Sequence, residues 1–466
     1  MAKQSITNIV DEARSPTKTI LLLAWPVLLE QIFTTLVNYV DTAMVGSLGA
    51  SATAAVSISG SAVMLLNGVV MALGVGITTL VARSAGAGDP ERVRELMRHA
   101  ILAILYVGVP ITAVIVSLHR LIPQWMGAAP DVLELASQYN FITGIGRIFM
   151  ITSMILNSAF RGYGDTRTPL RVNATMNVVN VIFNFLLIYP TRELTVFGVT
   201  FTMWGAGWGV AGAAMATSLG MATAGLQVLQ VAFFRKNGYE IDIHGSWKLD
   251  RPLVRQIFTI SLPAMLERMS MSASGIVITS SVAVLGTVSL AARNLCDAAE
   301  SLSFMPAFAF QTAATTLVGQ SLGAGKPDLA TKFVHRTLAL GTAMMVFTSI
   351  VLYVFAEPLI GVFTPDREVI ALASRCLRVV AFMQIPQTMG WVFVGALRGA
   401  GDTKAAFFIT AGTNWFIRAL GSVVVIRFLG FTLFEMQFVI LAEILVRMTL
   451  YALRFRSGKW KSAIKD

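Results

Sequence analysis

The second half of the chain repeats the first half at one constant shift in numbering, the shift that carries Pro26 onto Pro263. Four short motifs match across this repeat shift without a gap. The matched pairs are WPVLLE at 25 and LPAMLE at 262, LGASATAA at 48 and LGTVSLAA at 285, GAGDP at 86 and GAGKP at 323, and RGYGDT at 161 and RGAGDT at 398. Because chance rarely produces four matches at one offset, the repeat predicts two similar lobes with the same order of elements.

Long apolar runs with few charges recur through both lobes. Charged residues make up 13% of the 466 residues, whereas a soluble domain carries about 25%, and about 20 apolar residues suffice for a helix to cross a bilayer. We therefore predict an all-α integral membrane protein with twelve transmembrane helices in two six-helix lobes. The expected spans are 19–46, 53–82, 99–119, 133–160, 170–190, 204–234, 254–282, 290–319, 333–356, 370–397, 405–428 and 433–455.

The predicted domains are an N-terminal lobe at 1–234, a cytoplasmic linker at 235–255 and a C-terminal lobe at 256–466. Both lobes begin on the same side of the membrane, so the repeat is parallel, with its axis along the membrane normal. In transporters of this plan the substrate lies between the lobes near the midplane, and one lobe rocks against the other. A duplicated scaffold without a transport role is the alternative interpretation.

The distribution of Lys and Arg predicts the orientation. If both termini lie on one side, the loops on that side receive most of the basic residues, and the opposite loops hold only Arg120, Arg192, Arg367 and Arg427. Because basic loops stay in the cytoplasm, we expect a multi-pass protein of the cytoplasmic (inner) membrane with both termini cytoplasmic. The net charge of +11 comes from these short basic clusters. No basic patch interleaved with exposed aromatics is apparent, which argues against nucleic-acid binding.

Catalytic and metal-binding signatures are missing from the sequence. The two cysteines, Cys296 and Cys376, are far apart and lack the spacing of a zinc site or a disulfide framework. The HExxH, GxSxG and Walker motifs do not occur. We therefore expect no enzyme activity, no metal and no cofactor.

The span at 19–46 carries an unusual set of residues: Pro26, Glu30 and Asp41. An acid inside a membrane helix costs roughly 2.5–3.5 kcal/mol on insertion scales, so it is a functional candidate by default. The repeat shift places Ile278 at the position of Asp41, and lobe symmetry therefore does not require an acid there. Burial favours the neutral form of a carboxyl, as a proton carrier requires. A structural aspartate at the outer helix end, exposed to water, is the alternative.

Glu30 is repeated as Glu267, and each glutamate follows its proline by four residues. Arginines within the predicted spans are available to neutralise these acids; they are Arg147, Arg268 and Arg418. A repeated acid beside available arginines favours a scaffolding role over ion binding. Pro26 is the expected hinge, since proline removes a backbone hydrogen bond and can kink a helix.

The span at 170–190 offers partners for Asp41. Asn177, Asn180 and Asn184 recur at spacings of three and four residues, so they share one helix face. Amides inside a membrane need hydrogen-bond partners, and Asn184 and Asp41 both lie in the outer half of their spans. Asn177 shifts onto Asn414 and is more typical of structure. Joining of neighbouring helices by these amides is the alternative interpretation.

VDTAMVG at 40–46, together with the doubled GAGxP and RGxGDT motifs, resembles the MATE (multidrug and toxic compound extrusion) family over nearly the whole chain. The resemblance is strongest to the DinF-like branch. It implies a secondary antiporter that exports organic cations in exchange for protons or sodium ions. The other branch binds its cation in the second lobe with acids that include one on the tenth helix, and the span at 370–397 has none from Phe382 onward.

The resemblance also implies roles for individual residues. In DinF-like members the first-helix aspartate is networked with an Asn and an Asp of the fifth helix and a Thr that begins the sixth. Here Asp41 matches the first of these and Asn180 the second, Asn184 stands where the Asp is expected, and Thr202 matches the Thr. The loss of one carboxylate favours proton over sodium coupling, because hard cations select charged oxygens.

The sequence therefore predicts a monomeric multidrug antiporter in the lipid bilayer that exports amphipathic organic cations by alternating access, with protons as the favoured coupling ion, sodium as the alternative and Asp41 as the protonation site. A flippase or exporter of a lipid-linked or amphipathic metabolite is the second hypothesis, kept open by the membrane arginines Arg147 and Arg418. A passive channel is a third.

Overall fold

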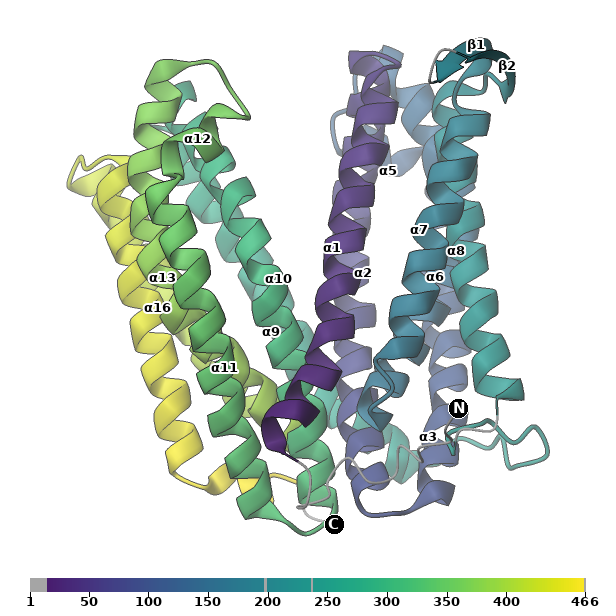
Figure 1. Ribbon diagram of the computed structural model, residues 1–466, viewed down its shortest axis with the longest axis vertical. Coiled ribbons are helices and arrows are strands. Elements are labelled where there is room, and N and C mark those ends of the chain that lie inside the picture. Colours follow the sequence, from purple (N-terminus) through teal and green to yellow (C-terminus); the bar gives the residue numbers. More distant parts are fainter. Residues whose placement is uncertain (1–14, 197–198, 236–237, 465–466) are drawn as a thin grey trace. The chain divides into compact units, whose positions relative to one another are not determined.

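The computed structural model describes residues 15–196, 199–235 and 238–464 (Figure 1). Within these residues, twelve long helical segments follow the twelve predicted spans in order, so the all-α membrane architecture is confirmed. Their bounds are α1 (Pro16–Gly46), α2 (Ala50–Gly86), α3 to α4 (Pro90–Ala103 and Val109–Ser117, joined by the π-helix η2 at Ile104–Gly108), α6 (Pro130–Tyr163), α7 (Arg167–Leu187), α8 (Gly209–Phe234), α9 (Arg251–Ala283), α10 (Thr287–Gly323), α11 (Pro327–Val354), α13 (Arg367–Ala400), α14 to η4 (Thr403–Thr413, η3 Asn414–Ala419, α15 Leu420–Val423 and η4 Val424–Phe428) and α16 (Leu433–Arg456).

Ten of these segments, among the residues described, are long and apolar enough to cross a membrane. The other two long helices, α9 and α10, have 33 and 37 residues, which is ample length at 1.5 Å per residue. Both carry charged side chains within the helix, among them Glu267 and Arg268 at the middle of α9.

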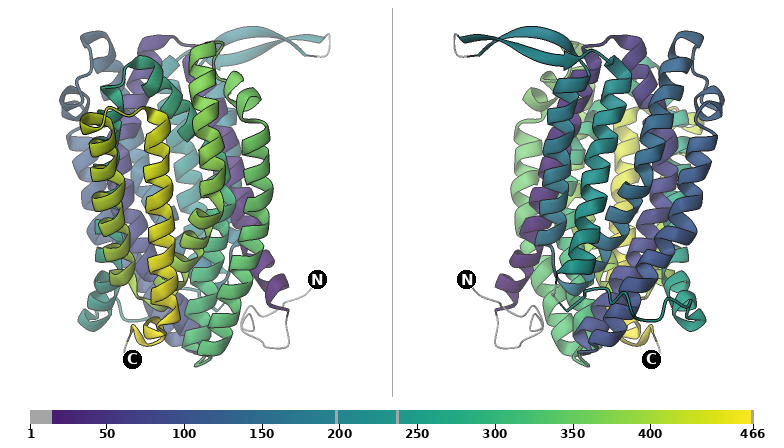
Figure 2. Two further views of the ribbon diagram at one scale, coloured as in Figure 1. Left: turned by 90° about the vertical axis from the view of Figure 1, so that its left-hand side faces the viewer. Right: turned by 90° about the vertical axis from the view of Figure 1, so that its right-hand side faces the viewer.

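Short elements occupy the connections. They are α5 (Leu121–Trp125), α12 (Ala356–Gly361), the 3₁₀ helix η5 (Lys459–Ser462) and the strands β1 (Pro190–Val196) and β2 (Val199–Ala206). The two strands form an antiparallel hairpin with Glu193 opposite Thr202, and Figure 2 shows it projecting from the end of the helices opposite to the stretch after α8. Because β2 extends to Ala206, α8 begins at Gly209 rather than at the predicted residue 204.

Packing divides the chain into two units. The N-terminal unit consists of Leu29–Ile77 and Pro90–Arg255, and the C-terminal unit consists of the chain up to Leu28, Thr78–Asp89 and the chain from Gln256 onward. The predicted division into 1–234, 235–255 and 256–466 follows the sequence repeat rather than the packing, and it stays a prediction. The first turns of α1 and the last turns of α2 pack with the C-terminal unit, so α1 changes unit shortly after Pro26.

The start of α1 contributes to the core of the C-terminal unit. Ile20, Leu23 and Val27 are fully buried there in a cluster with residues of α10, α11 and α13. Near its other end, Met44 and Val45 belong to an apolar cluster of the N-terminal unit with Ile188. One helix therefore serves two cores, and the proline in its interior lies near the point of change.

The RGxGDT motif ends α6 and α13 in the same way. Gly164 and Gly401 adopt left-handed φ values of 97° and 83° at the two helix ends, which only glycine adopts without strain. The aspartates differ in their contacts. Asp165 caps the next helix by accepting from the backbone N–H of Thr168 at 2.9 Å, whereas Asp402 accepts from Arg454 Nε at 2.8 Å.

The arginines of this motif hold the repeated glutamates. Arg161 donates to Glu30 at 2.5 Å and Asn173 donates to the same carboxylate at 2.7 Å. In the second copy, Arg398 donates to Glu267 at 2.8 Å, and the Thr410 hydroxyl donates to the same carboxylate at 3.0 Å. The scaffolding interpretation of Glu30 and Glu267 thus has a structural basis, but the expected neutralising arginines were wrong.

The ends of α2 and α10 cross within the C-terminal unit through a symmetric pair of glycines. A Cβ on Gly86 would lie 2.0 Å from the carbonyl oxygen of Gln320, and a Cβ on Gly323 would lie 2.0 Å from that of Arg83. The repeat shift carries Arg83 onto Gln320 and Gly86 onto Gly323, so the two contacts are copies of one another. The doubled GAGxP motif therefore encodes a backbone-to-backbone crossing.

We expect Gly323→Ala to lower the melting temperature of the detergent-solubilised protein, because the new methyl group has no space against Arg83. Overpacking of this kind costs about 1–3 kcal/mol. The matched control is Gly412→Ala in α14, where no atom lies within 4 Å of the added Cβ, and where alanine raises helix propensity. Equal melting temperatures for the two variants would contradict the crossing.

We expect Glu30→Gln and Arg161→Gln each to destabilise the protein by about 3–5 kcal/mol, because each removes one partner of a buried ion pair. The double variant is expected to be less destabilised than the sum of the two, which a double-mutant cycle of thermal unfolding measures. Additive effects would show that the pair does not interact. The exposed pair Arg378 and Glu357 serves as the control, with near-zero coupling expected.

Candidate functional site

Asp41 lies on α1 in the N-terminal unit, five residues before the helix ends at Gly46. Its side chain is half-buried and faces α7. Asn184 Nδ2 donates a hydrogen bond to Asp41 Oδ1 at 2.5 Å. Among the residues described, Asp41 forms no ion pair. Its partner in this structure is an amide, as the sequence predicted, and the aspartate is not a water-exposed residue at the helix end.

The hydrogen bonds continue from Asn184 to α8. Asn184 Nδ2 also donates to Asn180 Oδ1 at 3.2 Å, and Asn180 Nδ2 donates to Thr217 Oγ1 at 3.3 Å. Asn184 is completely buried and Asn180 is 9% exposed. A polar chain from Asp41 through two amides to a hydroxyl thus crosses three helices, α1, α7 and α8.

Small residues on α8 allow this chain to form. A Cβ on Gly212 would lie 2.3 Å from the carbonyl oxygen of Leu187, and a Cβ on Gly220 would lie 3.0 Å from that of Met176. Glycine at both positions lets α8 approach the backbone of α7, as small residues do in membrane helix pairs. The close approach brings Thr217, which lies between the two glycines, within reach of Asn180.

Two predicted site residues lie outside this chain of hydrogen bonds. Thr202 is in strand β2, exposed and opposite Glu193, and does not begin a helix. The threonine that contacts Asn180 is Thr217, inside α8. Asn177 is buried one turn from Asn180, and its Nδ2 has no hydrogen-bond partner among the described residues. Its repeat counterpart, Asn414, donates to Ser274 Oγ in the C-terminal unit. The only signal for Thr217 was its place in a run of small residues.

One buried acceptor beside Asp41 is free. Asn184 Oδ1 is inaccessible to solvent and has no hydrogen-bond partner in the part of the chain that the structure describes. Such an atom is costly unless it is satisfied in some state of the protein. Tyr139 and Arg147 complete the electrostatic surroundings, since the Tyr139 hydroxyl interacts with both Asp41 and Arg147. The site thus combines one carboxylate with one buried acceptor that has no partner among the described residues.

A strong metal centre does not fit these side chains. In the described ranges, no three His, Cys, Asp or Glu residues gather in a way that would hold a metal ion. Cys296 and Cys376 are both buried and free. One carboxylate with neutral amides suits a proton better than a divalent cation, which requires several charged oxygens.

Known proteins match the chain over almost its whole length. A probable multidrug resistance protein NorM of Thermotoga maritima is 26% identical over 454 residues, covering 97% of this chain and 94% of that protein. The crystal structure of MATE in complex with MaL6 has a TM-score of 0.88 at 20% identity and covers 99% of this chain and 100% of that one. An outward-facing multidrug resistance MATE family transporter of the MOP superfamily has a TM-score of 0.86 at 20% identity and covers 100% of both chains.

These relatives are named as transporters and resistance proteins rather than enzymes, in agreement with the expectation from the sequence. The model of the MatE family matches this chain twice, at residues 26–186 and at 263–424, once in each repeat. The chain therefore belongs to the MatE family.

Proposed function

We propose that the protein exports amphipathic organic cations across the cytoplasmic membrane in exchange for protons, with Asp41 as the protonation site. The observation that carries the proposal is the hydrogen bond from Asn184 to the Asp41 carboxylate, which forms no ion pair among the described residues and lies on an apolar membrane helix. The corresponding residues in the other repeat are Ile278 and Gly421. An acid that the repeat does not require, held by a buried amide, is the kind of group whose charge controls transport.

Protonation changes the hydrogen bonds that Asp41 makes. The ionised carboxylate accepts from Asn184 Nδ2, whereas the protonated carboxyl also has an O–H to donate. Asn184 Oδ1, the buried acceptor without a partner among the described residues, is the group of the site that can receive it. Protonation thus replaces one set of hydrogen bonds between Asp41 and Asn184 by another. This changes the contact between α1 and α7.

The rearrangement acts on a helix that is shared between two packing units. Residues of α1 up to Leu28 pack with the C-terminal unit, and those from Leu29 pack with the N-terminal unit. Pro26 lies near this change, and because proline has no backbone N–H, α1 lacks one helix hydrogen bond there. We propose that α1 bends there when Asp41 gains or loses its proton, and that the bend alters the space available to an organic cation.

Three further points support the proposal. The relatives bear names that refer to multidrug resistance. The site contains one carboxylate and no cation that neutralises it by an ion pair within the described residues, so an organic cation or a proton can do so. The excess of Lys and Arg in the loops on the side of the termini favours cytoplasmic termini.

We expect Asp41→Asn to abolish the response of transport to pH. Asparagine keeps a hydrogen bond to Asn184 but does not bind a proton in the physiological range. The measurement is efflux of ethidium from proteoliposomes under an imposed proton gradient, with a fall of at least about tenfold expected from the loss of a group that titrates. The control is Asp89→Asn, a change in the loop between α2 and α3. Coupling at the wild-type level in Asp41→Asn would refute the assignment.

We expect Asn184→Asp to introduce a response to sodium. The change places a second carboxylate beside Asp41, and hard cations prefer sites with more charged oxygens. Ethidium efflux driven by a sodium gradient, at equal pH on both sides, should be near background for the wild type and clearly raised for the variant. Sodium-driven efflux by the wild type would show that protons are not the coupling ion.

A further inference from the structure

The C-terminal unit contains an open cavity lined by α9, α10, α13, α14 and α16. The space inside it is about 60 Å³ and it opens to solvent, which is room for the charged group of a ligand rather than for a whole drug-sized molecule, whose sites occupy about 300–1,000 Å³. The charged residues of its lining are Glu267, Arg268, Arg398 and Arg447. Three arginines face one glutamate, and arginine is always charged in proteins. The wall of the cavity is therefore net positive.

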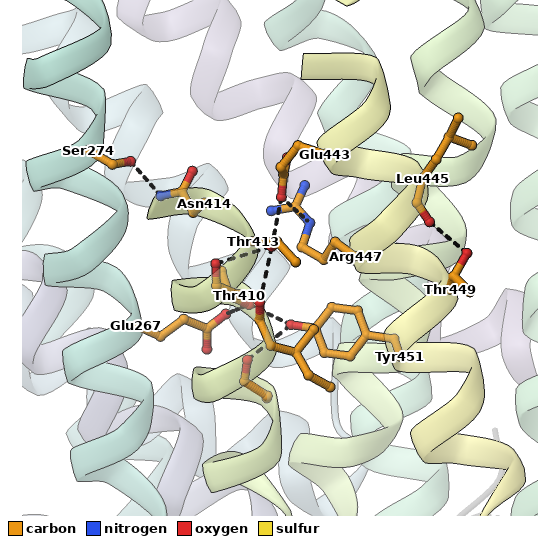
Figure 3. Close-up of polar contacts among 12 residues, drawn as sticks. Glu267, Ser274, Thr410, Thr413, Asn414, Glu443, Leu445, Arg447, Thr449 and Tyr451 are labelled. Atoms are coloured by element: carbon orange, nitrogen blue, oxygen red, sulfur yellow. Dashed lines mark hydrogen bonds and ion pairs between the residues drawn. The ribbon is translucent and has the colours of Figure 1, made fainter. Parts of the chain in front are cut away.

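Two of these arginines have a carboxylate of their own. Arg398 NH2 lies 2.8 Å from Glu267 Oε2. Arg447 Nε lies 3.3 Å from Glu443 Oε1, and Glu443 is completely buried behind the cavity wall and also accepts from Thr413 at 2.9 Å. Figure 3 shows Glu443 and Arg447 side by side on α16, and Glu267 pointing toward Thr410. These pairs cancel their own charges.

Arg268 is the charge that remains. It lies at the middle of α9, and its guanidinium makes no hydrogen bond or ion pair with any described residue. Its charge is attracted by Glu267 but repelled by Arg398, and Glu267 is already engaged by Arg398 and Thr410. A guanidinium at the centre of a membrane helix without a partner is costly. An anion in the cavity would neutralise it.

This charge is specific to the second repeat. The repeat shift carries Arg268 back to Gln31, directly after the matched pair Glu30 and Glu267. Because the first copy has a neutral side chain there, the duplicated scaffold does not require an arginine. Arg268 therefore needs an explanation beyond the architecture that the repeats share.

The rest of the lining is apolar and aromatic, which favours an anion that carries an apolar organic group. Met271, Trp391, Val394 and Ile444 face the cavity with Arg268, and Trp391 is held in place by stacking on Phe304, with ring centroids 5.8 Å apart. Aromatic and thioether side chains adapt to flat apolar groups. Guanidinium groups bind carboxylates through paired, charge-assisted hydrogen bonds.

We propose that this cavity binds an amphipathic organic anion, its carboxylate on Arg268 and its aromatic body against Trp391. The proposal goes beyond export of cations through Asp41, because it assigns a second ligand class to a different unit of the protein. It also fits a zwitterionic compound whose anionic part occupies this cavity.

The test uses dansylglycine, a fluorescent aromatic carboxylate, with the detergent-solubilised full-length protein and no ion gradient. Fluorescence anisotropy gives its Kd, and dansylglycinamide, the neutral analogue, should bind at least about tenfold more weakly, because it lacks the charge-assisted hydrogen bonds. Sensitised dansyl emission should fall in Trp391→Phe. Since the assay measures binding alone, a failure of proton-coupled transport does not affect it.

The variants move affinity in opposite directions. Arg268→Gln should raise the Kd at least about tenfold and Arg268→Lys should raise it less, since lysine keeps the charge but not the paired geometry. Glu267→Gln should lower the Kd, because it removes the only acid of the lining. The control is Arg427→Gln at the exposed end of η4. Monodisperse elution on size exclusion checks that each variant is folded.

Equal binding of the anion and the neutral analogue would overturn the proposal, and so would an unchanged Kd in both Arg268 variants. Tighter binding in Arg268→Gln together with weaker binding in Glu267→Gln would also overturn it, because that is the pattern of a cation site. Added phosphatidylglycerol identifies the source of the natural anion. Competition with dansylglycine assigns the cavity to a lipid headgroup, and its absence assigns the cavity to a soluble organic anion.

Discussion

Each repeat is fixed by one buried ion pair between its first helix and the arginine that ends its fourth. Glu30 with Arg161 and Glu267 with Arg398 are separated by 2.5 and 2.8 Å. A membrane interior offers no water to satisfy a charge, so each glutamate requires a partner at a fixed place. The partner arginine directly precedes a glycine-dependent turn, and this turn sets where the next helix starts. Helix order, turn geometry and charge neutralisation therefore depend on one another in both copies.

The proposed sites lie where the two copies differ in sequence. The first copy has Asp41 and Asn184 where the second has Ile278 and Gly421, and the second has Arg268 where the first has Gln31. Each difference adds a polar or charged group that the frame does not need. In each case a buried or cavity-lining group has no partner among the described residues: Asn184 Oδ1 in one unit and the Arg268 guanidinium in the other. We propose that duplication supplied two similar scaffolds and that these substitutions gave them sites of opposite charge.

The sequence placed some of the predicted site residues on one helix face because helix periodicity is a local property. Spacings of three and four residues place Asn180 and Asn184 on one face in any α-helix, and the structure joins them to Asp41 and to one another. Thr202 was misplaced because a hairpin replaces the start of the expected helix, and turn chemistry around 190–206 gives a weaker signal than apolar periodicity. The arginine partner of Glu30 was missed although Arg161 and Arg398 lie in a repeated motif, because they were assigned to loops beyond the helix ends.

The sequence by itself determined the twelve helices, their order, the twofold repeat and the acid that breaks it, because these follow from hydropathy, spacing and internal similarity along one chain. Only the tertiary structure decided which side chains meet across helices. The pairing of Glu30 with Arg161, the contact of Thr217 with Asn180 and the solitary charge of Arg268 all depend on residues that are far apart in sequence. Such contacts depend on how closely two helix backbones approach, which glycines such as Gly212 and Gly86 control and no single-helix pattern reveals.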